Sequence, residues 1–155
     1  MTKEGMGPML NYAQNQYRKT QVATVDRGRL IVLLYEGAIS FLIKAKTCLA
    51  EGDIPGCASL INRAQDIIDE LNASLNMELG GEIAGNLRRL YLYMGDRLVR
   101  AKIRREDAPI DEVIRILTSL NEAWREALGK PEAQEVLSRQ PAQPTTTQAR
   151  GGVRI

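Results

Sequence analysis

The chain has 155 residues, of which 44% are hydrophobic, 26% are charged and 5% are aromatic, which favours one soluble helical domain with a hydrophobic core. It contains no histidine, which excludes Ser-His-Asp triads, Cys-His dyads and histidine metal sites, and Cys48 and Cys57 fit neither a redox pair nor a zinc site. The net charge of +2 is too small to argue for nucleic acid. We therefore expect no catalytic residue, no metal and no cofactor.

Residues 1–25 are expected to form a short, mobile N-terminal cap segment. Within it we predict a short helix over 10–19, which carries Tyr12 and Tyr17, and an extended connector over 20–25, where β-branched residues gather. The first residues lack the apolar core of a secretory signal, and no stretch reaches the ~20 apolar residues that span a bilayer. We therefore expect a cytoplasmic protein that does not insert into a membrane.

The first long helix is predicted from Asp26, a good N-cap, to about residue 51, with Gly52 as its stop. Its stretch from Leu30 to Leu49 is apolar on two adjacent faces. A surface helix needs only one apolar stripe, so the second face needs cover from the same chain or from a partner. Leu33 and Leu34 point in different directions, and the sequence does not fix which of them faces outward.

Three further helices are predicted over about 53–79, 82–103 and 109–128, separated by glycine and proline signals. Each carries an apolar stripe at helical spacing, and the connections between them are short. We therefore predict an all-α fold, an antiparallel four-helix bundle over residues 26–130, followed by a flexible, disordered C-terminal tail over 131–155.

The third helix is basic, with seven basic and two acidic residues between Glu82 and Arg105. We favour a solvated helix that faces acidic neighbours within the bundle, and expect no nucleic-acid partner. The alternative is an RNA-binding helical regulator, although such a groove would interleave more aromatics than Tyr91 and Tyr93. A further alternative is self-association, in which the second apolar face makes a homodimer.

Four segments of the chain carry recognisable motifs. They are YRKTQVA from Tyr17, RLIVLLYEGAI from Arg29, AQDIIDELNASLNMELGGEIAGNLRRLYLYM from Ala64, and DEV from Asp111 with Trp124 after it. In order and spacing they resemble the flagellin-specific export chaperone family, FliS. The resemblance covers about residues 12–128, which is most of the chain.

This resemblance implies a non-enzymatic cytoplasmic chaperone built as a four-helix bundle. Such chaperones hold the disordered C-terminal segment of flagellin, which wraps around the bundle, prevent its polymerisation and deliver it to the flagellar type III export gate. The family's N-terminal tyrosine, matched here by Tyr12 or Tyr17, covers part of the groove when no client is present. A client-free homodimer is compatible with the same apolar surface.

We expect partner binding to be driven by apolar burial, as when amphipathic helices dock into grooves. Tyr35 could instead be a core residue, and Asn72 and Asn86 could be solvated surface amides. The predicted partner-binding residues are Tyr12, Tyr17, Val25, Leu30, Ile31, Leu34, Tyr35, Ala38, Leu42, Asn72, Leu75, Asn86, Leu90 and Tyr93.

Overall fold

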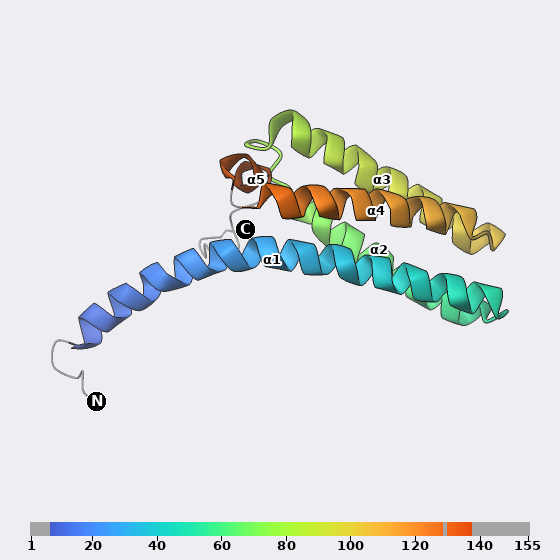
Figure 1. Cartoon of the computed structure of the whole chain (residues 1–155), viewed down its shortest axis with the longest axis horizontal. Coiled ribbons are helices and arrows are strands. Elements are labelled where there is room, and N and C mark those ends of the chain that lie inside the picture. Colours follow the sequence, from blue (N-terminus) through green and yellow to red (C-terminus); the bar gives the residue numbers. More distant parts are fainter. Residues whose placement is uncertain (1–6, 129, 138–155) are drawn as a thin grey trace, which may run out of the picture. The chain divides into compact units, whose positions relative to one another are not determined.

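The computed structural model describes residues 7–128 and 130–137, which form five helices (Figure 1). These are α1 (Gly7–Ala50), α2 (Ile54–Ala73), α3 (Gly81–Arg104), α4 (Ala108–Ala127) and α5 (Pro131–Val136). Within those residues the only β-type pairing is an isolated bridge between Leu75 and Leu137. The predicted all-α fold is confirmed. No helix in this part of the chain is long and apolar enough to cross a bilayer.

From Ile31 onward the helices form one compact unit in which α2 packs on α3 and α3 packs on α4. Short connections make sequential helices antiparallel, so the predicted four-helix bundle is confirmed (Figure 1). The core is continuous across all four helices, and Cys57 lies in it as a free thiol. Its fully buried large side chains include Tyr35, Leu42, Ile61, Ile68, Leu71, Met94, Leu98, Ile110 and Leu117.

Helix α1 runs without a break from Gly7 to Ala50. The predicted connector over 20–25 and the N-cap at Asp26 are therefore wrong. The β-branched residues there lower helix propensity by only tenths of a kcal/mol each, and a helix that already exists extends without a new nucleation cost. The side chains of residues 7–26 and the whole of residues 1–6 lie outside the described part, so the cap role of Tyr12 and Tyr17 stays a prediction.

The turn between α1 and α2 is formed as the sequence predicts. Gly52 has φ +81°, a left-handed conformation that favours glycine directly after a helix. Asp53 caps α2, because its Oδ1 accepts a hydrogen bond from the Gly56 backbone N–H at 3.0 Å. Helix α2 ends at Ala73, six residues before the predicted end, and Asn76 Oδ1 then accepts from the backbone N–H groups of Glu78 and Leu79. This local turn replaces the last helical turns that the sequence predicts.

Residues 131–137 differ from the predicted flexible tail, because they form α5 and the residue that follows it. Ala133, Val136 and Leu137 are buried, at the i, i+3, i+4 spacing of one helix face. Their burial against the end of the bundle is the physical reason that this stretch is ordered. Residues 138–155, where the rest of the predicted tail falls, lie outside the described part.

Candidate partner-binding surface

The inner stripe of α1 is occupied by the core. Ile31, Tyr35, Ala38 and Leu42 are all at most 3% exposed. These four residues of the predicted partner-binding set face the inside of the bundle, so a partner could reach them only if the helices moved apart. The sequence predicts two apolar faces on this helix, and only the helix phase in the folded bundle decides which one is inner.

A buried hydrogen-bond network ties α1 to α3 and α4. The hydroxyl oxygens of Tyr35 and Tyr91 lie 2.5 Å apart, and Trp124 Nε1 donates to the Tyr35 hydroxyl at 2.9 Å. Burial raises the pKa of both tyrosines, so their hydroxyls stay neutral and can donate as well as accept. Tyr35 is therefore a core residue with a structural partner on each of two other helices.

The exposed fractions of the consecutive residues Leu33 and Leu34 show which side of α1 faces outward. Leu33 is 55% exposed, whereas Leu34 is half-buried and packs against the core. Leu30 and Ile43 are also exposed. Of the two leucines it is therefore Leu33 that points outward, although the predicted set contains Leu34.

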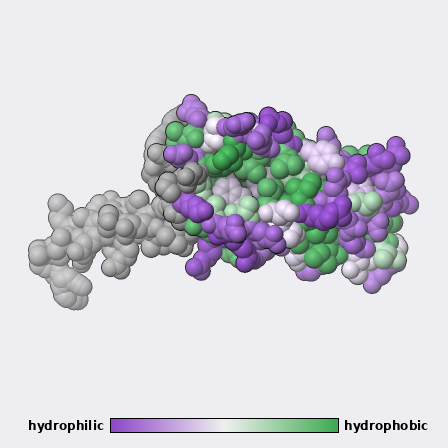
Figure 2. All heavy atoms as spheres, turned by 45° about the horizontal axis from the view of Figure 1, so that its top comes forward, coloured by the Kyte–Doolittle hydropathy of each residue, from purple (hydrophilic) through white to green (hydrophobic). Residues whose placement is uncertain are grey.

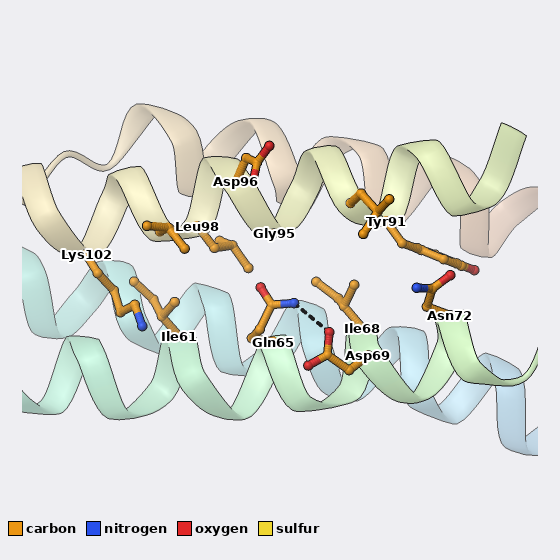
Figure 3. A pocket seen from close by; sticks show the side chains of 12 residues that line it. Ile61, Gln65, Ile68, Asp69, Asn72, Tyr91, Gly95, Asp96, Leu98 and Lys102 are labelled. Carbon is orange, nitrogen blue, oxygen red and sulfur yellow. Dashed lines mark hydrogen bonds between the residues drawn. The ribbon is translucent and has the colours of Figure 1, made fainter.

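A groove of about 240 Å³ runs between α2 and α3 (Figure 3). Its floor is apolar, with Ile61 and Ile68 from α2 and Leu98 from α3. On the α2 side Gln65 Nε2 donates to Asp69 Oδ1 at 2.9 Å, so this edge is polar and ordered. The view in Figure 3 places Asn72 at one end of the groove and Lys102 at the other. The groove thus combines an apolar floor with polar ends.

The α3 edge of this groove continues into an exposed apolar row, Leu92, Val99 and Ile103, which we call the α3 stripe. These side chains are 58%, 47% and 74% exposed. Their spacing of seven and four residues places them on one side of the helix, away from the inner residues Met94 and Leu98. Figure 2 looks onto the side of the molecule that bears α3 and α4, where hydrophobic side chains lie in the open between hydrophilic ones.

None of the three residues of the α3 stripe is in the predicted partner-binding set, which contains only Leu90 and Tyr93 near the middle of this helix. Leu90 is half-buried, and Tyr93 is exposed and donates to Glu112 Oε2 at 2.5 Å. A signal was available, because apolar residues that fall off the inner stripe of a helix must face another direction. Both α1 and α3 carry apolar residues outside their inner stripe, but the prediction of partner contacts rests on those of α1.

The remaining predicted residues are not brought together. Asn72 lines the groove, and its Oδ1 accepts from Arg88 Nε at 3.3 Å. Leu75 is buried at the end of α2, whereas Asn86 is exposed and accepts from Arg89. Of these three residues only Asn72 lines the α2–α3 groove, and the side chain of Val25 lies outside the described part.

The basic side chains of α3 are engaged by neighbours within the bundle. Arg97 Nε lies 2.7 Å from Glu112 Oε1, and Lys102 Nζ donates to Asn62 Oδ1 at 2.7 Å. The Tyr93 hydroxyl and the Arg97 guanidinium lower the pKa of Glu112, because both stabilise its carboxylate. The Arg97–Glu112 pair fits the interpretation of a basic helix beside acidic neighbours, whereas Lys102 donates to the amide of Asn62.

Comparison with known proteins shows which family the chain resembles. The model of the family described as "Flagellar protein FliS" matches residues 9–131. The chain is 38% identical over 118 residues to the flagellar secretion chaperone FliS of Salmonella typhimurium, covering 76% of this chain and 87% of that protein. It is 38% identical over 116 residues to FliSB of Pseudomonas aeruginosa, covering 72% and 92%, and 31% identical over 112 residues to FliS of Bacillus subtilis, covering 72% and 83%.

A solved structure shares the fold. It is described as a flagellar chaperone from bacteria, superposes with a TM-score of 0.62, and is 24% identical in sequence. The superposition covers 66% of this chain and 83% of that one. Because the family model spans most of the chain and the relatives match over most of their own length, the chain belongs to the FliS family of flagellar secretion chaperones.

Proposed function

We propose that this chain acts in the cytoplasm, where it binds the disordered C-terminal segment of flagellin, prevents premature polymerisation and delivers the subunit to the flagellar type III export apparatus. The role is one of binding, without catalysis. Family membership supports the general class. The observation that carries the specific proposal is the α3 stripe beside the α2–α3 groove, because exposed apolar side chains in a row are what an amphipathic client helix needs.

The size of the expected interface supports a client that wraps around the bundle. A disordered segment that folds on binding typically buries about 1,000–3,000 Å². The α2–α3 groove encloses only about 240 Å³, so it cannot supply an interface of that area by itself. Further exposed apolar side chains occur on α1 at Leu33 and Ile43, and near the start of α3 at Leu79 and Ile83. A client that reaches from one of these places to the next would cover the required area.

The predicted binding residues enter this proposal in two groups. Leu30, Asn72, Leu90 and Tyr93 are at least partly accessible and are proposed as direct contacts. Tyr12 and Tyr17 are proposed as an internal cover that competes with the client, since each aromatic ring can bury roughly 150–250 Å².

The test is a titration of the full chain with a fluorescent peptide that spans the C-terminal segment of the cognate flagellin. We expect saturable binding at micromolar or lower concentration. Because apolar burial drives this binding, the affinity should change little between about 50 and 200 mM salt. Binding that depends on phosphate contacts weakens steeply over the same range. Absence of binding at micromolar concentration would refute the proposal.

Two control measurements separate the alternative functions. A single-stranded RNA of mixed sequence should bind weakly and lose that binding at the higher salt concentration. Sedimentation of the free chain at several concentrations reports whether a homodimer competes with the client. Tight RNA binding without flagellin binding would favour the regulator instead.

A further inference from the structure

The cations of helix α3 have neutral partners more often than acidic ones. The helix carries six basic and two acidic residues. Three of the basic side chains donate to the Oδ1 atoms of asparagine residues: Arg88 to Asn72 at 3.3 Å, Arg89 to Asn86, and Lys102 to Asn62 at 2.7 Å. An amide oxygen orients a cation but carries no charge that would neutralise it. These three side chains therefore keep their full positive charge.

The other three basic residues differ in how well their charge is compensated. Arg97 Nε lies 2.7 Å from Glu112 Oε1, whereas the Arg100–Glu106 contact is long, at 3.4 Å, and exposed. No ion pair of Arg104 occurs within the part of the chain that the structure describes. Arg104 thus joins the three cations that have amide partners. We call these four residues the two cation pairs: Arg88 with Arg89, and Lys102 with Arg104.

The two cation pairs lie at opposite ends of the α3 stripe. The first pair precedes Leu92 by four and three residues, and the second pair flanks Ile103 on either side in the sequence. Residues three or four apart on a helix are neighbours on its surface. Figure 3 shows the same order, with Lys102 at one end of the groove and Asn72, the partner of Arg88, at the other.

The α3 stripe forms a ridge between two hollows. Val99 lines the α2–α3 groove on one side and a more open hollow of about 420 Å³ on the other, to which Ile103 and Arg104 also contribute. Helices pack by fitting such ridges between the side-chain rows of a partner helix. Asp96, the acidic residue of α3 between the two cation pairs, lines both hollows. A docked helix thus meets aliphatic side chains along the ridge, a carboxylate near its middle and cations at its ends.

This pattern fits an acidic protein segment better than RNA. Single-stranded nucleic acid binds by stacking its bases on aromatic rings, and the ridge is aliphatic. The exposed aromatic side chain of α3, Tyr93, donates to Glu112. A protein helix with aliphatic side chains along one face and carboxylates toward both ends satisfies the ridge and the cation pairs together.

We propose that the part of the client that docks on the α3 stripe is an acidic amphipathic helix, with its carboxylates on the two cation pairs. The inference rests on the proposed function, because the client is the flagellin C-terminal segment. Apolar burial supplies most of the affinity, and the ion pairs select which stretch of the client binds here. A client carboxylate is disfavoured near Asp96, so the middle of the docked segment is neutral or positive.

A cycle of two proteins and two peptides tests this. The first peptide spans the C-terminal segment of the cognate flagellin, and the second has every Asp and Glu of it replaced by Asn or Gln. At about 150 mM salt the unaltered chain should bind the first about 3- to 10-fold more tightly, since exposed ion pairs each contribute modestly and salt screens close contacts only partly. In Arg89→Gln/Arg104→Gln, which removes one cation from each pair, this ratio should fall to about twofold or less.

The control variant Arg115→Gln/Lys130→Gln loses the same charge at exposed positions outside α3 and should keep the full ratio. Urea midpoints check that both variants keep the bundle intact. If the ratio is equal in the two variants, or is one in the unaltered chain, the inference is overturned while the proposed function stands. If neither peptide binds to the unaltered chain, the proposed function fails and the inference with it.

Competition separates phosphate from carboxylate ligands. Oligouridylate at micromolar concentration should leave the flagellin peptide bound at about 150 mM salt, where binding through phosphate contacts is weak. Displacement of the peptide by this RNA, lost in Arg89→Gln/Arg104→Gln, would assign the cation pairs to phosphate and overturn the inference.

Discussion

Helices α1 and α3 each carry more apolar residues than one core-facing stripe needs, and the inner stripe of α1 and the α3 stripe lie in opposite surroundings. On α1 the stripe through Tyr35 and Leu42 is fully buried, and it is fastened to α3 and α4 by the Tyr35–Tyr91–Trp124 hydrogen bonds. On α3 the stripe through Val99 and Ile103 stays in solvent beside a groove. Apolar side chains thus build the core on the inner stripe of α1 and lie in solvent on the α3 stripe, as Leu33 and Ile43 do on the outer face of α1.

Exposure, rather than apolar content, therefore separates residues that a partner can reach from core residues. A substitution in the α1 stripe should change the free energy of unfolding, and one in the α3 stripe should change client affinity with little effect on stability. Four variants test whether buried and exposed positions differ in this way.

Replacing Tyr35 by alanine should destabilise the chain most. The change removes a fully buried aromatic ring and leaves the Tyr91 hydroxyl and the Trp124 N–H without their partner. We expect a loss of about 3–5 kcal/mol in the free energy of unfolding, measured by urea denaturation. Leu33→Ala, at an exposed position of the same helix, is the matched control and should change it by about 0.5 kcal/mol or less. Similar losses in both variants would contradict the assignment of the inner face.

The double variant Val99→Asp/Ile103→Asp should act on binding instead. Placing two carboxylates in the α3 stripe opposes apolar contact, so flagellin-peptide affinity should fall about 10- to 100-fold. The urea midpoint should stay close to that of the unaltered chain, because both positions are exposed. Thr118→Asp/Ser119→Asp adds the same charge on the exposed face of α4 and should keep the affinity. An affinity unchanged in the α3 variant would remove this stripe from the proposed interface.

Tyr35→Phe keeps the ring and removes only the hydroxyl. Two buried donors on α3 and α4 then lose a partner, and we expect a loss of about 1–2 kcal/mol in unfolding free energy. The exposed hydroxyl of Tyr93 offers the comparison, since Tyr93→Phe should cost clearly less. If the two phenylalanine variants were equally stable, the buried network would contribute nothing beyond ring packing.

The pH dependence of Glu112 should give the smallest effect. Its pKa in the folded chain lies below the ordinary 4.5, so its stabilising contribution is present above about pH 4.5 and is lost as the pH falls through the lowered value. The difference in urea midpoint between the unaltered chain and Glu112→Gln should therefore be largest near neutral pH and shrink below about pH 4.5. A difference that stays constant down to about pH 3 would show that the carboxylate charge is not its cause.

Much of the architecture follows from local signals. Gly52 and Asp53 place the first turn correctly, because a left-handed glycine and a capping carboxylate act within a few residues. The errors occur where local preference is weak. The helix continues through residues 20–25 despite β-branched residues, and it ends early at Ala73 because Asn76 forms its own turn. Residues 131–137 are ordered only through contacts with distant parts of the chain.

The proposed binding surface follows less directly from the sequence than the fold does. The sequence predicts Ile31, Tyr35, Ala38 and Leu42 as partner residues because they lie on one of two apolar faces of the helix, and the structure places all four in the core. The α3 stripe is not in the predicted partner-binding set, because its apolar residues alternate with charged ones and the segment as a whole is less hydrophobic. Helical spacing shows that two apolar faces exist, but it does not say which of them the fold buries.

Local signals in the sequence were enough for the existence of the four long helices, the cap at Asp53 and the family, because each depends on residue type and spacing within short segments or on the order of motifs. The rotation of each helix about its own axis is fixed by the folded bundle, and it settles which of Leu33 and Leu34 points outward, the role of Tyr35 and the exposure of the α3 stripe. That rotation is set by packing against three other helices at once. It is a property of contacts between residues as far apart in the chain as Tyr35 and Trp124, which no local pattern contains.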